Sequence, residues 1–135
     1  MADNIDYLLK ELKDPKREIE LVRSGLKTTV VESFLGEQNL AVKDVLERLD
    51  IPASTYFAKK KNHHALDAYT TEKFIRLISV IVLADKILGK SEGREWVQRK
   101  IPSLANEIPL NLLDTETGHR LVVDALLQIK HGIYG

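Results

Sequence analysis

Residues 77–84 have the sequence Leu-Ile-Ser-Val-Ile-Val-Leu-Ala, which is apolar at every position except Ser79. Arg76 and Asp85 bracket this run, so it is far shorter than the roughly 20 apolar residues that cross a bilayer. A helix that is apolar on nearly every face is buried on most sides. The run therefore predicts a helix that lies at the centre of a core or at a subunit interface.

Capping residues predict where this helix begins and ends. Asp67 can cap a helix that starts near Ala68, and Gly89 can close it after Leu88. Shorter helices are expected at residues 15–25, 29–36, 42–49, 53–61, 91–100 and 116–132. Their expected N-caps are Asp14, Thr29 in a capping box, Ser91, and either Asp114 or Thr115. Alternating strand patterns are almost absent, so the predicted fold class is all-α.

Composition limits the classes of protein that the chain can form. Its 135 residues are 44% hydrophobic and contain no cysteine, which fits one domain or two small helical lobes without disulfides. The 20 basic and 20 acidic residues balance, so any contact with DNA must come from a local patch. The N-terminal residues show no signal-peptide pattern, and we expect a cytoplasmic protein without a membrane segment.

Two short helices separated by a sharp break predict a helix-turn-helix at residues 42–61. The break is Asp50-Ile51-Pro52. If the second helix enters a major groove, its small hydroxyl and lysine side chains would contact phosphates and base edges. These candidate DNA-binding residues are Ser54, Thr55, Lys59, Lys60 and Lys61. The alternative is a three-helix scaffold whose lysine-rich end is only solvated.

No combination of residues predicts catalysis or a metal site. His63 and His64 are adjacent and have no helix-spaced partners, whereas zinc needs three or four convergent ligands. His119 and His131 are too isolated in the sequence to be ranked as general bases. We therefore expect no enzymatic activity, no metal and no cofactor.

The C-terminal segment is unusually apolar for the end of a chain. Ile133 and Tyr134 follow Gly132, which is expected to stop the last helix. Residues in such a position either fold back on the core or are offered to a partner. Composition does not decide between these two possibilities.

At this point the residues resemble a known family, the Xre/MbcA/ParS antitoxins. The resemblance to their toxin-binding domain rests on Leu66-Asp67, Gly89, Trp96-Val97, Pro102, Leu104, the segment Pro109-Leu110-Asn111-Leu112-Leu113-Asp114-Thr115-Glu116-Thr117-Gly118, and the ending from Leu126 to Gly135. The upstream part resembles the family's Xre-like helix-turn-helix, and the likeness covers about Gly25 to Gly135. The sequence departs from the family pattern at Ala41, Asp50 and Pro52, all within the helix-turn-helix.

The resemblance implies a partner and a mode of action. The partner is a RES-domain toxin, similar to ADP-ribosyltransferases, that depletes NAD. The antitoxin is a homodimer that neutralises the toxin by contact and represses the shared operon at operator DNA. The implied organisation is an N-terminal helix-turn-helix lobe (residues 1–65) packed on a helical toxin-binding lobe (residues 66–135).

The C-terminal segment is the part expected to block the toxin. Its residues are Lys130, His131, Gly132, Ile133, Tyr134 and Gly135. Tyr134 could fill a ring-sized pocket of an NAD cleft, and the carboxylate of Gly135 could meet a phosphate-binding arginine.

Two other functions stay open from the sequence. One is a helix-turn-helix transcriptional repressor whose C-terminal lobe only dimerises. The other is a helical adaptor that binds neither DNA nor a toxin.

Overall fold

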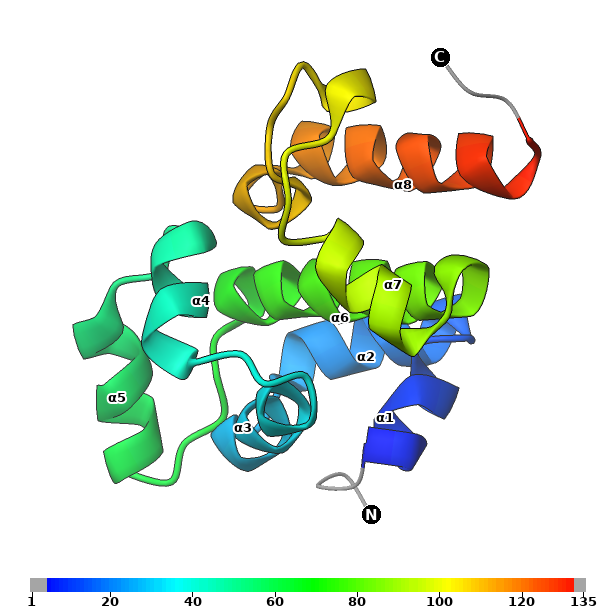
Figure 1. The fold of residues 1–135 in the computed structure, drawn as a ribbon. Helices are drawn as coiled ribbons and strands as arrows, with labels where there is room; N and C mark the ends of the chain where they lie inside the picture. Colours follow the sequence, from blue (N-terminus) through cyan, green and yellow to red (C-terminus); the bar gives the residue numbers. More distant parts are fainter. Residues whose placement is uncertain (1–4, 133–135) are drawn as a thin grey trace. The chain divides into compact units, whose positions relative to one another are not determined.

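The computed structural model describes residues 5–132, which form helices and contain no β-strand (Figure 1). This confirms the predicted all-α fold. An isolated bridge joins Ile101 and Glu107. In chain order the elements are α1 (Ile5–Glu11), α2 (Pro15–Ser24), α3 (Thr28–Glu37), α4 (Val42–Arg48), α5 (Ala53–Lys61), α6 (Ala68–Leu88), α7 (Lys90–Trp96), the 3-10 turns η1 (Pro102–Leu104) and η2 (Pro109–Leu112), and α8 (Glu116–Lys130).

The chain divides into two compact units, residues 1–74 and 75–135, and the division falls inside α6. The lobe boundary predicted between residues 65 and 66 remains a prediction. Across residues 5–132, no helix has the length and apolar character needed to cross a membrane.

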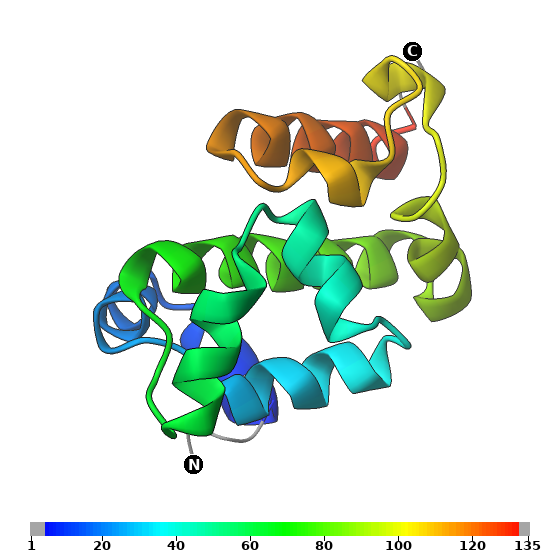
Figure 2. The same ribbon diagram turned by 90° about the vertical axis from the view of Figure 1, so that its left-hand side faces the viewer.

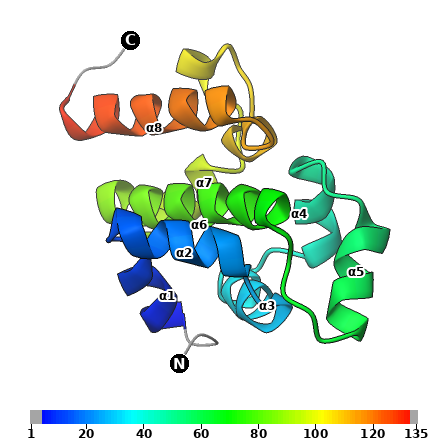
Figure 3. The ribbon, with the colours of Figure 1, turned by 180° about the vertical axis from the view of Figure 1, so that it is seen from behind.

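The first unit contains α1 to α5 and the beginning of α6. Within it α1 packs against α2 and α3, and α5 packs against α3 and α4. Figure 2 shows α3 together with α4 and α5, the two helices of the helix-turn-helix. Figure 3 shows α1 and α2 on the side away from α4 and α5. The helix-turn-helix shape predicted at residues 42–61 is therefore present as α4 and α5.

Helices α3, α4 and α5 all end in the same way. Each is followed by a non-glycine residue with positive φ, namely Asn39 (57°), Asp50 (54°) and His63 (55°). In each case the next residue donates its N–H to the carbonyl five positions back, as in Ile51 to Leu46 (2.9 Å). These bonds form Schellman caps, which satisfy the last helix carbonyls and turn the chain sharply.

The second unit contains the rest of α6, α7, η1, η2 and α8. In this unit α8 packs against η1 and η2. Trp96 is buried, and the N–H of Leu110 donates to the carbonyl of the neighbouring Val97 (3.1 Å). Gly118 lies so close to η2 that a β-carbon there would overlap the carbonyl oxygen of Leu112. Only glycine therefore fits at this point of α8.

The apolar run that predicted the central helix is largely buried. Five of its eight residues are buried, and they are Leu77, Ile78, Val80, Ile81 and Ala84. Val82 is the exception, with 38% of its surface exposed. The run therefore serves mainly as core, and one face of α6 stays open.

Three predicted N-caps are confirmed by side-chain hydrogen bonds. Asp14 accepts the N–H of Lys16 (3.1 Å). Asp67 accepts the N–H of Thr70 (2.7 Å), and this bond holds the pKa of Asp67 below its usual value. Thr115 accepts the N–H of Gly118 (3.0 Å) and so begins α8.

Two other predicted caps are wrong. Helix α3 begins one residue before Thr29, after Lys27, which makes no side-chain cap. Helix α7 begins at Lys90 after Gly89, so Ser91 lies inside the helix. Helix α7 ends at Trp96, four residues before the predicted end at Lys100. Helix α1 was not predicted at all.

We expect Gly118→Ala to lower the free energy of unfolding by about 1–3 kcal/mol, because the added methyl group would overlap the Leu112 carbonyl. Gly36→Ala is the matched control, since Gly36 also lies in a helix but a β-carbon there meets no atom within 4 Å. That change should raise stability by roughly 0.5–1 kcal/mol, because glycine has more backbone entropy to lose. Urea denaturation compares the variants, and equal stabilities would contradict the close packing.

Candidate functional site

The turn of the helix-turn-helix is held by a buried lysine. Lys73 on α6 is 4% exposed, and its ammonium donates to the carbonyl oxygens of Leu49 (2.8 Å) and Asp50 (3.1 Å). Asp50 adopts the positive φ that the turn requires, although glycine is the usual residue for such a conformation. The turn therefore forms although Asp50 stands where the family usually has glycine.

A carboxylate connects α5 to α3. Glu32 accepts the hydroxyl of Tyr56 (2.9 Å) and pairs with the ammonium of Lys60 (3.0 Å). Burial, together with the bond to Glu32, raises the pKa of Tyr56, so its hydroxyl stays protonated as a donor. These contacts fix α5 rigidly against its neighbour.

The predicted DNA-binding residues are not equally available. Ser54, Thr55 and Lys61 are exposed, and Lys59 is half-buried. Lys60 is exposed too, but its charge is partly used by the ion pair with Glu32. One end of α5 thus presents hydroxyls and the other presents lysines, which are side-chain types that contact DNA phosphates. Ala41 and Pro52, where the sequence departs from the family pattern, are the N-cap residues of α4 and α5. Neither side chain accepts a hydrogen bond from the helix, so each helix begins without a side-chain cap.

The predicted toxin-binding segment begins where α8 ends. Helix α8 runs to Lys130, His131 is its C-cap, and Gly132 takes a positive φ of 72°. Lys130, His131 and Gly132 are all exposed. Ile133, Tyr134 and Gly135, the other predicted residues, lie outside the residues that the structure describes.

An arginine holds the turn that leads into α8. Arg76 on α6 donates to the carbonyl oxygens of Leu113 and Asp114, each at 3.2 Å, and lies 4.0 Å from Glu116. These bonds satisfy carbonyls between η2 and α8 and set the start of α8. Arg76, Lys73 and Glu32 were all missed by the sequence analysis. Their partners lie 23 to 38 positions away, and no local pattern marks such contacts.

The histidines do not gather into a site. Within residues 5–132 no group of three or more His, Cys, Asp or Glu side chains is placed to hold a metal. His64 donates its backbone N–H to Lys59, which makes His63 and His64 part of the cap of α5. The Nδ1 of His119 lies 3.9 Å from a carboxylate oxygen of Glu116, and neither ring nitrogen has a hydrogen-bond partner among the described residues.

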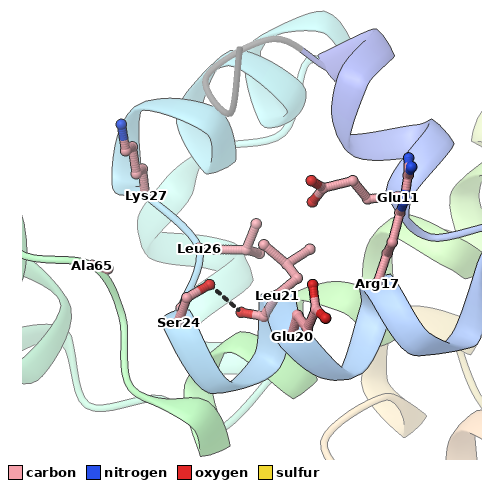
Figure 4. A pocket seen from close by; sticks show the side chains of 9 residues that line it. Glu11, Arg17, Glu20, Leu21, Ser24, Leu26, Lys27 and Ala65 are labelled. Carbon is pink, nitrogen blue, oxygen red and sulfur yellow. Dashed lines mark hydrogen bonds between the residues drawn. The ribbon is translucent and has the colours of Figure 1, made fainter.

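A cavity of about 320 Å³ lies between α1, α2 and the segment before α3 (Figure 4). Leu21 and Leu26 give it an apolar side, and Ser24 bonds back to the carbonyl of Leu21 (3.3 Å). Its charged lining consists of Glu11, Glu20, Arg17 and Lys27. The charges balance, and none of the residues predicted for DNA or toxin binding lies here.

A family of known proteins matches the C-terminal part of this chain, and individual relatives match most of it. Residues 83–132 match the family described as antitoxin Xre/MbcA/ParS C-terminal toxin-binding domain. The match spans the last part of α6, α7, η1, η2 and α8.

Three relatives extend the similarity over most of the chain. "Antitoxin Xre" of Yersinia enterocolitica is 22% identical over 86% of this chain and 80% of its own length. "Prs ADP-ribosylating antitoxin" of a Sphingobium species is 22% identical over 89% of this chain and 82% of its own length. "Antitoxin Xre" of Photorhabdus laumondii is 24% identical over 84% and 78%.

The chain is therefore similar to antitoxins that carry a C-terminal toxin-binding domain, and the residues that its structure describes are mainly helical. More narrowly, the domain match and the three relatives point to the Xre/MbcA/ParS type of antitoxin.

The pKa of His119 is lowered from 6.5, mainly because burial disfavours the imidazolium, and Arg76 lowers it further while Glu116 opposes the shift. As the pH falls below 6.5, the unfolded chain takes up this proton before the folded chain does. The contribution of neutral His119 to stability is therefore complete at higher pH and is lost as the pH falls through the folded pKa.

We expect His119→Gln to reduce the fall in melting temperature between about pH 7.5 and pH 5.5, because the variant has no proton to take up there. Thermal unfolding at both pH values measures the effect. His64→Gln, an exposed histidine, is the control and should behave as wild type. If the melting temperature falls equally in His119→Gln and in wild type, the lowered pKa of His119 is contradicted.

Proposed function

We propose that this antitoxin inhibits a RES-domain, NAD-degrading toxin by placing the segment Lys130 to Gly135 in the toxin's active site. The carrying observation is that the match to a toxin-binding domain runs to residue 132, where α8 has just ended and Gly132 redirects the chain. Helix α8, which precedes this segment, is anchored by Thr115, Arg76 and Gly118, so the helix itself needs little further ordering on binding.

The expected chemistry of the toxin comes from the family and from the name of one relative. A RES-domain toxin consumes NAD, and the Sphingobium relative is named for ADP-ribosylation. An ADP-ribosylating toxin would also bind NAD, the usual ADP-ribosyl donor. Both toxins need a cleft for a dinucleotide, which an aromatic ring such as that of Tyr134 would occupy.

Deletion of Ile133 to Gly135 should abolish inhibition of the toxin's NAD consumption, because the part that enters the cleft is removed. The measurement is the rate of NAD loss with increasing antitoxin, together with protection of cells that express the toxin. Circular dichroism controls for folding. If the truncated, folded protein inhibits as well as the full chain, the segment does not block the toxin.

The same protein is proposed to repress its own operon as a homodimer. The supporting observation is the rigid helix-turn-helix with Ser54, Thr55, Lys59 and Lys61 on α5. A dimer is expected because paired half-sites are read by two such helices. A repressor whose C-terminal lobe only dimerises is the second hypothesis, and the toxin-binding domain match favours the first. We expect no catalytic activity of the chain itself.

We expect Lys61→Ala to weaken binding to operator DNA and to reduce the steepness of its salt dependence by about one unit, because one phosphate contact is lost. Lys60→Ala should have a smaller effect, since Lys60 is paired with Glu32. Lys13→Ala removes an exposed lysine between α1 and α2 and is the charge-matched control. Fluorescence anisotropy at several salt concentrations gives the slopes. An equal effect of all three changes would contradict the placement of DNA on α5.

A further inference from the structure

Helix α8 has two different faces. Its buried face consists of Gly118, Val122, Ala125 and Leu126. On its other side Leu121, Asp124, Gln128 and His131 are all exposed. Their spacing of three, four and three residues follows the helix period, so they form one stripe about 15 Å long. We call this stripe the outer face of α8.

Leu121 is the apolar member of the outer face. It is 52% exposed, more than Val82, the other large apolar residue that is exposed in residues 75–132. A single exposed leucine is ordinary on a protein surface. Here, however, the leucine lies inside the segment that matches a toxin-binding domain, and the stripe leads from it directly to His131, in the proposed blocking segment.

We propose that the outer face of α8 is the surface that docks on the toxin, and that Leu121 is its anchor. This rests on the proposed function and separates it into two steps. The outer face supplies the binding, and the segment beyond Lys130 supplies the inhibition. The partner that fits is a toxin surface with an apolar recess for Leu121 and a cationic side chain opposite Asp124.

The geometry suits docking because α8 does not need to be ordered by the toxin. Thr115 caps it, Gly118 packs it onto η2, and Arg76 holds the turn before it. An amphipathic helix that lays a preformed face into a groove uses anchors at this spacing. Anchors near the centre of such interfaces carry most of the affinity, and polar residues around them exclude water.

Charge on the outer face makes the choice of partner specific. Asp124 is exposed and has no ion pair within residues 5–132, so its carboxylate can meet a cation of the toxin. Arg120 is also exposed and lies one turn before Asp124, so this side of α8 carries both signs of charge. His131 lies at the other end of the stripe, at the C-cap of α8.

The test uses the full chain and a purified RES-domain toxin, the partner that the proposed function names. Leu121→Glu places a charge in the proposed recess, and we expect binding to weaken by about 30-fold or more. Leu121→Ala should weaken binding less. Val82→Glu is the matched control, because it also puts a carboxylate at an exposed apolar position of the second unit, but on α6. Calorimetry measures binding, NAD consumption measures inhibition, and thermal unfolding confirms that each variant is folded.

The deletion of Ile133 to Gly135 separates the two steps. Under this proposal the truncated chain still binds the toxin within a few-fold of wild type but does not inhibit it. Leu121→Glu that binds as wild type, or Val82→Glu that binds as weakly as Leu121→Glu, would overturn the docking surface. A truncated chain that still inhibits would instead overturn the blocking role of the segment and leave the docking result standing.

Discussion

The constraint on which this structure depends is that buried and partly buried backbone carbonyls in its turns need hydrogen-bond donors. Lys73 and Arg76, three residues apart on α6, each donate to two carbonyl oxygens. Lys73 does so in the turn of the helix-turn-helix, and Arg76 in the turn before α8. A carbonyl left without a donor in such a place costs about 1–3 kcal/mol. One helix thus supplies the donors for the turns that place both candidate functional helices.

The same constraint explains how the helix-turn-helix tolerates residues that are unusual for it. Asp50 takes the conformation that glycine usually provides, and the Schellman bonds of α4 together with Lys73 hold it there. Ala41 and Pro52 leave α4 and α5 without side-chain caps. Packing of Tyr56 and its bond to Glu32 compensate within α5, because a buried, fully bonded side chain fixes the helix from its middle.

Which side chains are available to a partner follows from which side chains are already bonded within the chain. The ammonium of Lys60 forms an ion pair with Glu32, whereas Lys61 is exposed at the end of α5. Asp124 and Leu121 are exposed on a helix whose opposite side is packed. Groups that are hydrogen-bonded within the chain build the scaffold, and exposed groups on rigid helices remain for the proposed contacts with DNA and with the toxin.

The sequence by itself determined the helices that carry strong local signals. Asp14, Asp67 and Thr115 cap their helices as predicted, because the geometry of a helix start brings an N-cap side chain close to an N–H two or three residues later. It also indicated the antitoxin class, through the motif from Pro109 to Gly118. Only the tertiary structure decided which charges are available. Lys73 and Lys60 look alike in the sequence, but their partners lie 24 and 28 residues away, and packing alone brings them together.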